Sequence, residues 1–332
     1  MPDCQIVDIV SYMPERIIDN ELFYPKDDKD DLANNPFFRG VKQRRFASPE
    51  YTSADLGTKA LQKLLNRTET DPNSIDLIIS TCIFSDTYWP GIGPALQHGV
   101  KAGNANILNI DTSCCSFLSG LNIAQAYIES GRYKKIVIVT VTNFISRLPE
   151  FQKSRRSSVL GDGATATLVV AGKPSILASY EKSLGQYYGN FKFEPDLVDG
   201  RFLNYWERGC GPITVNFVPE MVEEIRSNAL ELVPMVIREC LKIAKITPND
   251  LALLFTHQPN RMFIDEWRKR VGVDSLHAHD TLEIYGNLFQ SSIPVSFADA
   301  LEKGKIRKDD LIAMGAFSMG GEFISAIAMR WI

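Results

Sequence analysis

The sequence predicts an α/β fold made of two similar halves that stack in layers. Continuous apolar runs alternate with helical segments along the 332 residues, which is typical of strands buried on both faces. In addition, one pattern of helix, turn and strand occurs twice. Strands that lie between helices favour largely parallel sheets, so we expect two α/β layers of this kind.

The repeated pattern consists of a helix, a Pro-Asn turn and a buried strand. In the first half, a helix over residues 54–65 leads through T-D-P-N-S into the apolar run 75–80. In the second half, a helix over residues 221–244 leads through I-T-P-N-D into the run 251–256. This correspondence favours an internal duplication, although alternation of strands and helices is common enough for coincidence to stay open.

The two halves also end alike, which indicates where one stops and the other begins. A basic segment that starts with glycine precedes the strand predicted at 136–142, and a similar segment precedes the strand predicted at 311–317. The run 165–171 is the last strand expected in the first half. We therefore divide the chain into residues 1–172, which carry the cysteine discussed below, and residues 173–332, which carry a histidine and an asparagine.

Two segments are expected to lie at the surface. Residues 183–218 are rich in aromatic side chains, and linkers are rarely so apolar, so we expect a loop-rich cover over a site. The stretch 24–36 contains D-D-K-D-D and is expected to be a solvated loop.

Composition excludes several classes of function. A formal charge of -4 and an isoelectric point near 5.7 provide no basic surface for nucleic acid. The start lacks the features of a signal peptide, and no apolar run reaches the length of a membrane span. Six cysteines in a chain of this length are not a disulfide framework, and four scattered histidines without a C-x-x-C pair indicate no metal site. We expect a reduced, cytoplasmic protein.

A pair of cysteines lies between a predicted strand and a predicted helix. Cys114 and Cys115 follow the apolar run 107–110 and precede the helix expected at 117–129. In such a turn the helix points N–H groups at the central residue, which lowers a thiol pKa and offers an oxyanion donor. Sequence physics barely separates the two cysteines, and a role for both as small buried fillers is an open alternative.

An imidazole and an amide provide partners for such a thiol. His257 follows the predicted strand 251–256, at a place where ligand sites of α/β proteins form. Asn287 lies in a turn that opens the helix expected at 293–301. Each has a structural alternative, as a hydrogen-bonded core imidazole and as an ordinary turn residue. Together with a cysteine, they indicate covalent acyl chemistry.

Several motifs follow one another along the chain. They are S-Y-M-P-E-R-I-I-D-N-E-L, R-G-V-K-Q-R-R, S-C-C-S-F-L-S-G-L, L-G-D-G-A-T-A, H-Q-P-N and Y-G-N-L-F-Q-S-S-I-P-V. In this order they resemble the β-ketoacyl-acyl-carrier-protein synthase III family of thiolase-like condensing enzymes, and the likeness runs nearly end to end. The third motif resembles the family's A-C-S-G-F turn, which places the nucleophile on Cys114 and not on Cys115.

The resemblance implies a thiolase-like fold with α-β-α-β-α layers, a site where the halves meet, and usually a homodimer, with a heterodimer of this chain and a relative as the alternative. It implies a ping-pong cycle in which Cys114 takes an acyl group from a thioester, guided by the backbone N–H groups of Cys114 and Met319. His257 and Asn287 then stabilise the enolate of a malonyl- or ketoacyl-thioester. No cofactor is expected, because the acyl group arrives on coenzyme A or on the phosphopantetheine of an acyl carrier protein.

Departures from the family pattern limit the substrate assignment. Near the nucleophile and in the glycine-rich turn towards the C-terminus, the replaced positions are Cys115, Ser116, Ser318 and Met319. The residues that grip coenzyme A in familiar members fall at Asn34, Phe38 and Met262 here. These losses argue against routine coenzyme A recognition.

Basic and aromatic residues suggest how substrates are held. Arg155, Arg156 and Arg261 are candidates to dock the acidic helix of a carrier protein, although a solvated surface is the commoner role of such residues. By the same resemblance, Trp89 and Phe117 are expected at the acyl tunnel, with Trp89 closing the tunnel of the partner subunit. An ordinary core tryptophan is the alternative.

The leading hypothesis is a type III ketosynthase-like acyltransferase of specialised polyketide or fatty-acid-like biosynthesis. Related acyltransferases pass the acyl group to an alcohol or amine, and their Asn or His position tends to change. Retention of both His257 and Asn287 therefore favours condensation. The alternative from another class is a catalytically silent subunit of a heterodimeric synthase, which usually lacks the Cys or the His found here.

Overall fold

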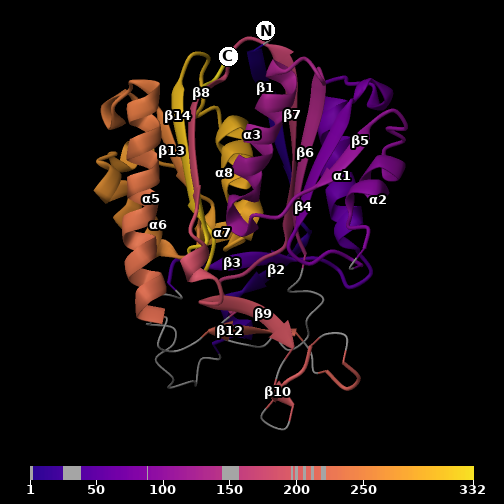
Figure 1. The fold of residues 1–332 in the computed structure, drawn as a ribbon, viewed down its shortest axis with the longest axis vertical. Coiled ribbons are helices and arrows are strands. Elements are labelled where there is room, and N and C mark those ends of the chain that lie inside the picture. The colour runs from indigo at the N-terminus through magenta and orange to yellow at the C-terminus, as the bar shows by residue number, and fades with distance from the viewer. Residues whose placement is uncertain are drawn as a thin grey trace.

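The computed structural model describes residues 3–24, 39–87, 89–143, 157–195, 197–198, 201–204, 207–210, 213–217 and 222–332. Two sheets alternate with layers of helices, so that helices cover both faces of each sheet (Figure 1). The predicted α-β-α-β-α layering is confirmed.

The two sheets have mixed strand directions. The first has the order β1 (Asp3–Tyr12), β7 (Gly163–Gly172), β6 (Lys135–Thr142), β4 (Leu77–Cys82) and β5 (Asn106–Asn109). The second has the order β13 (Leu253–Thr256), β14 (Leu311–Phe317), β15 (Phe323–Arg330) and β8 (Ile176–Ser183). β4 is parallel to β5 and β6, and β13 is parallel to β14, whereas the other described pairs in these sheets are antiparallel.

The expectation of largely parallel sheets is therefore wrong. The apolar runs were interpreted correctly as strands with both faces buried, because β4, β6 and β14 are buried along nearly their whole length. Burial on both faces follows from the layers of helices that flank each sheet. It does not determine strand direction, since an antiparallel strand in the same position is equally covered.

The outer layers consist of amphipathic helices. α1 (Ser53–Arg67) and α2 (Gly93–Gly99) cover the outer face of the first sheet, and α5 (Val222–Ala244) and α6 (Arg261–Val271) cover that of the second (Figure 1). The start of α1 is fixed by a capping box between Thr52 and Asp55. The predicted helices 54–65 and 221–244 are confirmed within the described residues.

The repeated Pro-Asn turns have corresponding conformations. η4 (Pro72–Ser74) and η9 (Pro248–Asp250) are short 3-10 helices that begin with proline and precede β4 and β13. Each is closed by an aspartate near its ends. Asp71 accepts a hydrogen bond from the Asn73 N–H at 3.0 Å, and Asp250 accepts one from the Thr247 N–H at 2.7 Å. This local correspondence supports the proposed duplication.

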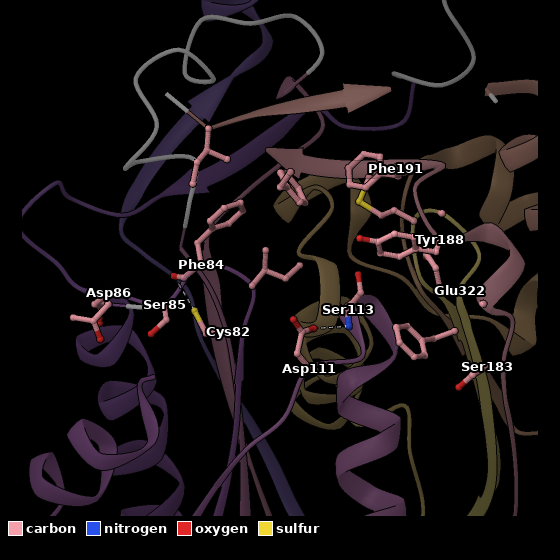
Figure 2. A pocket seen from close by; sticks show the side chains of 18 residues that line it. Cys82, Phe84, Ser85, Asp86, Asp111, Ser113, Ser183, Tyr188, Phe191 and Glu322 are labelled. Atoms are coloured by element: carbon pink, nitrogen blue, oxygen red, sulfur yellow. Dashed lines mark hydrogen bonds between the residues drawn. The ribbon is translucent and has the colours of Figure 1, made fainter. Parts of the chain in front are cut away.

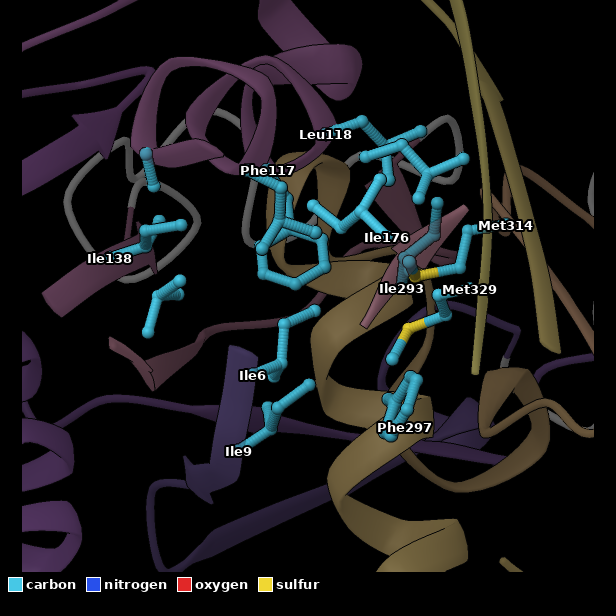
Figure 3. Packing of buried hydrophobic residues seen from close by; sticks show 14 of the residues in the cluster. Ile6, Ile9, Phe117, Leu118, Ile138, Ile176, Ile293, Phe297, Met314 and Met329 are labelled. Atoms are coloured by element: carbon cyan, nitrogen blue, oxygen red, sulfur yellow. The ribbon is translucent and has the colours of Figure 1, made fainter. Parts of the chain in front are cut away.

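The middle layer consists of α3 (Ser116–Glu129) and α8 (Ser292–Glu302), which lie between the sheets (Figure 1). Figure 3 shows Phe117 of α3 and Ile293 and Phe297 of α8 packed among side chains from both sheets, including Ile6 and Met314. Because α3 comes from the first half and α8 from the second, this core holds the two halves together.

Short strands lie at one end of the layers (Figure 1). They are β2 (Arg16–Asp19) with β3 (Gln43–Phe46), β9 (Phe191–Pro195) with β12 (Ile213–Phe217), and β10 (Leu197–Val198) with β11 (Arg201–Phe202). The aromatic segment 183–218 thus contains short strands in addition to loops. The predicted solvated loop 24–36 lies, apart from Tyr24, outside the described residues.

The division at residue 172 stays a prediction. The membership of the sheets supports it, because every described strand of the first sheet ends by Gly172 and every described strand of the second begins at or after Ile176.

Within the described residues, no helix is both long and apolar enough to cross a membrane.

Replacing Phe297 by alanine should destabilise the protein by about 3–5 kcal/mol, because it leaves a cavity in the middle layer. Phe297 is fully buried, and its ring stacks on Phe255 with centroids 4.9 Å apart. Urea unfolding followed by circular dichroism measures the change. The control is Ile243→Ala on the outer face of α5, where the side chain is 53% exposed; we expect a change within about 0.5 kcal/mol there. Equal losses in the two variants would contradict the middle-layer core.

Candidate active site

Residues that follow several buried strands meet at the end of the layers beneath the short strands. The segments after β4, β5 and β14 line a common pocket. The residue after β13, His257, donates its backbone N–H to the Gly315 carbonyl of β14 at 2.9 Å. The carboxyl ends of parallel strands in α/β proteins are where ligand sites form, and each predicted catalytic side chain lies on a segment that packs at this end.

Cys114 lies in the tight turn η5 (Ser113–Cys115), directly before α3. Ser113 has a left-handed backbone, with φ of 53°, and its N–H is held by the Asp111 carboxylate at 2.8 Å. A left-handed non-glycine residue costs on the order of 1 kcal/mol, and such residues collect at functional sites. The turn thus presents Cys114 at the start of a helix, as predicted.

The two cysteines have different surroundings. Cys115 donates its thiol hydrogen to the Phe323 carbonyl at 3.4 Å and belongs to the core between the sheets. Cys114 instead packs with Phe289 and with residues that line the pocket, including Met319. Burial raises the pKa of Cys114 to about 12, although the Ser113 hydroxyl acts in the opposite direction. Burial likewise raises the pKa of Cys115 well above its ordinary value.

His257 is buried and uncharged. Its side chain is 1% exposed, and burial lowers the pKa of the imidazole to about 3, with a backbone hydrogen bond at Phe289 opposing the shift. Nδ1 has no hydrogen-bond partner among the described residues. A buried polar atom without a partner costs free energy, which makes it a candidate to meet substrate.

Asn287 is positioned by its own turn. Its N–H donates to the Val159 carbonyl at 2.6 Å, and its carbonyl accepts from the Gly161 N–H at 3.2 Å. The side-chain Oδ1 accepts from the Phe289 N–H at 2.9 Å. Because the oxygen of this amide is occupied, the NH2 group is the part of the side chain that remains to donate a hydrogen bond to a substrate.

Phe289 connects the three predicted residues. Its backbone bonds to Asn287 and to His257, and it belongs to the same buried cluster as Cys114. The turn η11 (Phe289–Ser291) that it begins packs against η5. Phe289 is left-handed, with φ of 48°. The sequence showed no signal for this role, because an aromatic residue in an apolar stretch is ordinarily a core residue.

The predicted oxyanion turn has a fixed backbone. The Ser318 N–H donates to the Phe323 carbonyl at 2.8 Å, and the Gly321 N–H donates to the Ser318 carbonyl at 2.9 Å. The N–H of Met319 donates no hydrogen bond to any of the described residues. Met319 lines the pocket that Ser113 also lines.

The pocket beside Cys114 has a volume of about 960 Å³ (Figure 2). Its walls are mostly aromatic and apolar, with a few acidic side chains. The residues that line the pocket include Phe84, Asp86, Asp111, Tyr188, Phe191 and Glu322. Several come from the aromatic segment 183–218, so its predicted place over a site agrees with the position of these residues.

The two predicted tunnel residues differ in exposure. Phe117 is 1% exposed in the core between the sheets, where its ring packs in the middle layer, and its place at an acyl tunnel stays a prediction. Trp89 is 85% exposed, which rules out the alternative of a core tryptophan.

The candidate docking residues are only partly described. Arg155 and Arg156, like the replaced positions Asn34 and Phe38, lie outside the described residues. Arg261 makes a bidentate ion pair with Asp280 at 2.8 Å for both nitrogens, so its charge is already compensated. Met262 packs against the core under α6.

Metal ligation finds no support in the described part of the chain. There, no group of three or more His, Cys, Asp or Glu side chains is placed to hold a metal ion.

Comparison with known proteins identifies one family over both halves. The model of 3-Oxoacyl-[acyl-carrier-protein (ACP)] synthase III matches residues 108–185, which include Cys114. The model of 3-Oxoacyl-[acyl-carrier-protein (ACP)] synthase III C terminal matches residues 241–331, which include His257 and Asn287.

Relatives of similar length carry the same description. The chain is 28% identical over 331 residues to the Beta-ketoacyl-[acyl-carrier-protein] synthase III of Caldanaerobacter subterraneus subsp. tengcongensis, with 97% of this chain and 96% of the relative covered. The structure of 3-oxoacyl-[acyl-carrier-protein] synthase III from Aquifex aeolicus VF5 matches with a TM-score of 0.82 and 25% identity, over 98% of this chain and 99% of that one.

A polyketide enzyme shares the fold. The priming β-ketosynthase of the R1128 polyketide biosynthetic pathway has a TM-score of 0.85 at 21% identity, with 99% of this chain and 96% of that chain covered. At this identity the likeness concerns the fold alone.

Because models of one family match both halves and the relatives are covered nearly end to end, the chain belongs to the 3-oxoacyl-[acyl-carrier-protein] synthase III family of acyl-transferring condensing enzymes.

Proposed function

We propose that the protein is a type III ketosynthase that forms a carbon–carbon bond by a ping-pong cycle on Cys114, in specialised polyketide or fatty-acid-like biosynthesis. The observation that carries this proposal is the convergence of Cys114, His257 and Asn287 on Phe289. A nucleophile and two donors around one turn are what acyl transfer followed by enolate formation requires.

In the first half-reaction, the Cys114 thiolate attacks the carbonyl of an acyl-thioester. A new bond forms between the acyl carbon and the cysteine sulfur, and the bond between the acyl carbon and the donor sulfur breaks. The donor leaves as a thiol after taking up a proton. The tetrahedral oxyanion would be held by the N–H groups of Cys114 and Met319, which come from η5 and from the turn 318–321. The N-terminus of α3 also favours the thiolate.

In the second half-reaction, a malonyl- or ketoacyl-thioester provides the carbon nucleophile. Loss of carbon dioxide from a malonyl group leaves its electron pair as an enolate, whose oxygen is stabilised by hydrogen bonds from His257 and Asn287. The enolate carbon attacks the acyl-enzyme, and the Cys114 thiolate is released. The neutral state of the buried imidazole suits this task, because a neutral ring can donate a hydrogen bond without carrying a charge into an apolar site.

We also propose that the acyl groups arrive as thioesters of coenzyme A or of an acyl carrier protein, and that the working form is a dimer. Arg155 and Arg156 are the docking candidates that we retain. We leave out Arg261, since its guanidinium is bound to Asp280. The exposed ring of Trp89 is in keeping with its proposed place at the tunnel of a partner subunit.

The first prediction assigns the nucleophile. After incubation with a panel of acyl-thioesters on coenzyme A and on carrier protein, intact-protein mass spectrometry should show one acyl adduct on the wild type. Cys114→Ala should lose the adduct, and Cys115→Ala should keep it, because the Cys115 thiol faces the core between the sheets. Peptide mapping of the adduct to Cys115 would overturn the assignment.

The second prediction separates the half-reactions. His257→Ala and Asn287→Ala should still acylate Cys114, but decarboxylation of a malonyl donor should slow by about 10²–10³-fold, as for removal of an oxyanion donor. Release of carbon dioxide and product formation are the measurements. Product formation at the wild-type rate by Asn287→Ala would instead favour transfer of the acyl group to an alcohol or amine.

The third prediction concerns pH. Because burial raises the pKa of Cys114 to about 12, the thiolate fraction should grow about tenfold per pH unit across the neutral range. The rate of acylation should rise accordingly between about pH 6 and 9. The pKa of His257 is lowered to about 3, so imidazole protonation should produce no break near its ordinary pKa. A plateau of the acylation rate below about pH 8 would show that the thiolate forms by another route.

A further inference from the structure

One charged side chain in the pocket has no role in the cycle described above. Glu322 lies between the turn 318–321 and β15, and its side chain lines the pocket that Ser113 and Met319 also line. Figure 2 shows it on the same side of the pocket as Tyr188. A carboxylate in this place is unexpected, because negative charge develops at the neighbouring thiol and oxyanion during acyl transfer.

The position of the carboxylate is fixed by the turn itself. Oε2 of Glu322 accepts a hydrogen bond from the Ser318 hydroxyl at 2.7 Å, and the same hydroxyl oxygen accepts from the Phe323 N–H at 2.9 Å. The Glu322 carbonyl accepts from the Leu184 N–H at 2.7 Å. A Cβ on Gly320 would overlap the Glu322 carboxylate in its present position and would require that side chain to shift, so the glycine leaves space for this position.

The charge of Glu322 is not compensated by the described residues. Asp86 accepts from the N–H groups that begin α1, and Asp111 accepts from the Ser113 N–H, so both other acids in the pocket have backbone partners. No lysine, arginine or histidine is among the described residues that line the pocket, and no ion pair within the described residues includes Glu322. Lys192 is exposed on β9, with its ammonium 5.7 Å from the centre of the Tyr188 ring.

An uncompensated carboxylate has a cost for the chemistry. Burial has the largest effect on the pKa of Cys114, and the negative charges of Asp111 and then of Glu322 raise that pKa further. It would also disfavour the oxyanion at the turn that carries it. Both effects disappear when a cation binds beside the carboxylate, since the net charge at that place is then close to zero.

The other walls suit an organic cation. Tyr188, Phe191 and Phe84 present aromatic rings to the pocket. Aromatic faces attract ammonium groups, and a carboxylate adds a charge-assisted hydrogen bond. An uncharged alkyl chain in the same place would bury the carboxylate with only the Ser318 hydroxyl as its partner and no positive charge beside it, which is unfavourable.

We propose that Glu322 is a specificity-determining residue that binds a protonated amine on the acyl chain of the substrate. The substrate class is therefore an amino-acyl thioester whose ammonium group is separated from the thioester by a short chain. The inference rests on the proposed acylation of Cys114 and adds to it the chemical nature of the acyl group.

The test compares pairs of thioesters that differ only in an ammonium or a methyl group at the chain end. Suitable pairs are β-alanyl with butyryl and ε-aminocaproyl with heptanoyl, each carried on pantetheine. The rate of Cys114 acylation is followed by intact-protein mass spectrometry. The wild type should prefer the amino member of at least one pair by about 10- to 100-fold, the factor expected for one charge-assisted hydrogen bond.

Two variants identify the source of the preference. Glu322→Gln should abolish it while preserving the contact to the Ser318 hydroxyl, because the amide oxygen still accepts that hydrogen bond. The same variant should accept the uncharged members faster than the wild type does. Glu15→Gln is the matched control, since Glu15 is exposed and does not line the pocket, and it should retain the wild-type preference.

The outcomes separate this inference from the proposed function. Equal acylation by both members of each pair, or an undiminished preference in Glu322→Gln, would show that Glu322 does not select the substrate, while Cys114 acylation would stand. Failure of every thioester, charged or neutral, to acylate Cys114 would instead contradict the proposed function on which the inference rests.

Discussion

The geometry of the candidate site depends on one turn in which two halves of the chain are joined. Gly286 has φ of 71° and lies so close to the Val159 carbonyl that any side chain would collide with it. That contact lets the Asn287 N–H reach the same carbonyl at 2.6 Å, which ties the second half to the first. The turn then continues through the left-handed Phe289, which bonds to both Asn287 and His257. A left-handed backbone is unfavourable at a residue other than glycine. We infer that packing of the middle layer maintains this conformation at Phe289.

Burial gives the site its electrostatic character. It raises the pKa of Cys114 and lowers the pKa of His257, and in both cases it favours the uncharged form. Cys114 and His257 therefore do not form an ion pair with each other in the resting site. The donors His257 and Asn287 carry no charge of their own, and hydrogen bonds to an oxyanion gain strength in apolar surroundings when that charge appears during reaction.

The sequence predicted the parts of the fold that depend on apolar patterning. The run 311–317 became β14, and the turns before β4 and β13 share a conformation because both contain Pro-Asn with an aspartate near its ends. Strand direction was not predictable, since a strand buried on both faces has the same apolar sequence pattern whether it is parallel or antiparallel. Resemblance distinguished Cys114 from Cys115 where the residues alone did not, and the structure supplies a physical reason in their different neighbours. Phe289 and Glu322 were missed, because a left-handed φ and an uncompensated charge exist only in three dimensions.

The position of Glu322 sets the pocket apart from one that suits simple alkyl groups. The turn that would hold an oxyanion also carries a fixed negative charge, bound to the Ser318 hydroxyl and packed over Gly320. Like charges oppose each other in an apolar site, so the arrangement is unfavourable for chemistry on an uncharged chain. The departures in this turn are linked, since the hydroxyl of Ser318 holds the carboxylate and the absence of a side chain at Gly320 makes room for it. A cationic acyl group resolves the conflict, because the substrate then supplies the positive charge that the described walls of the pocket lack.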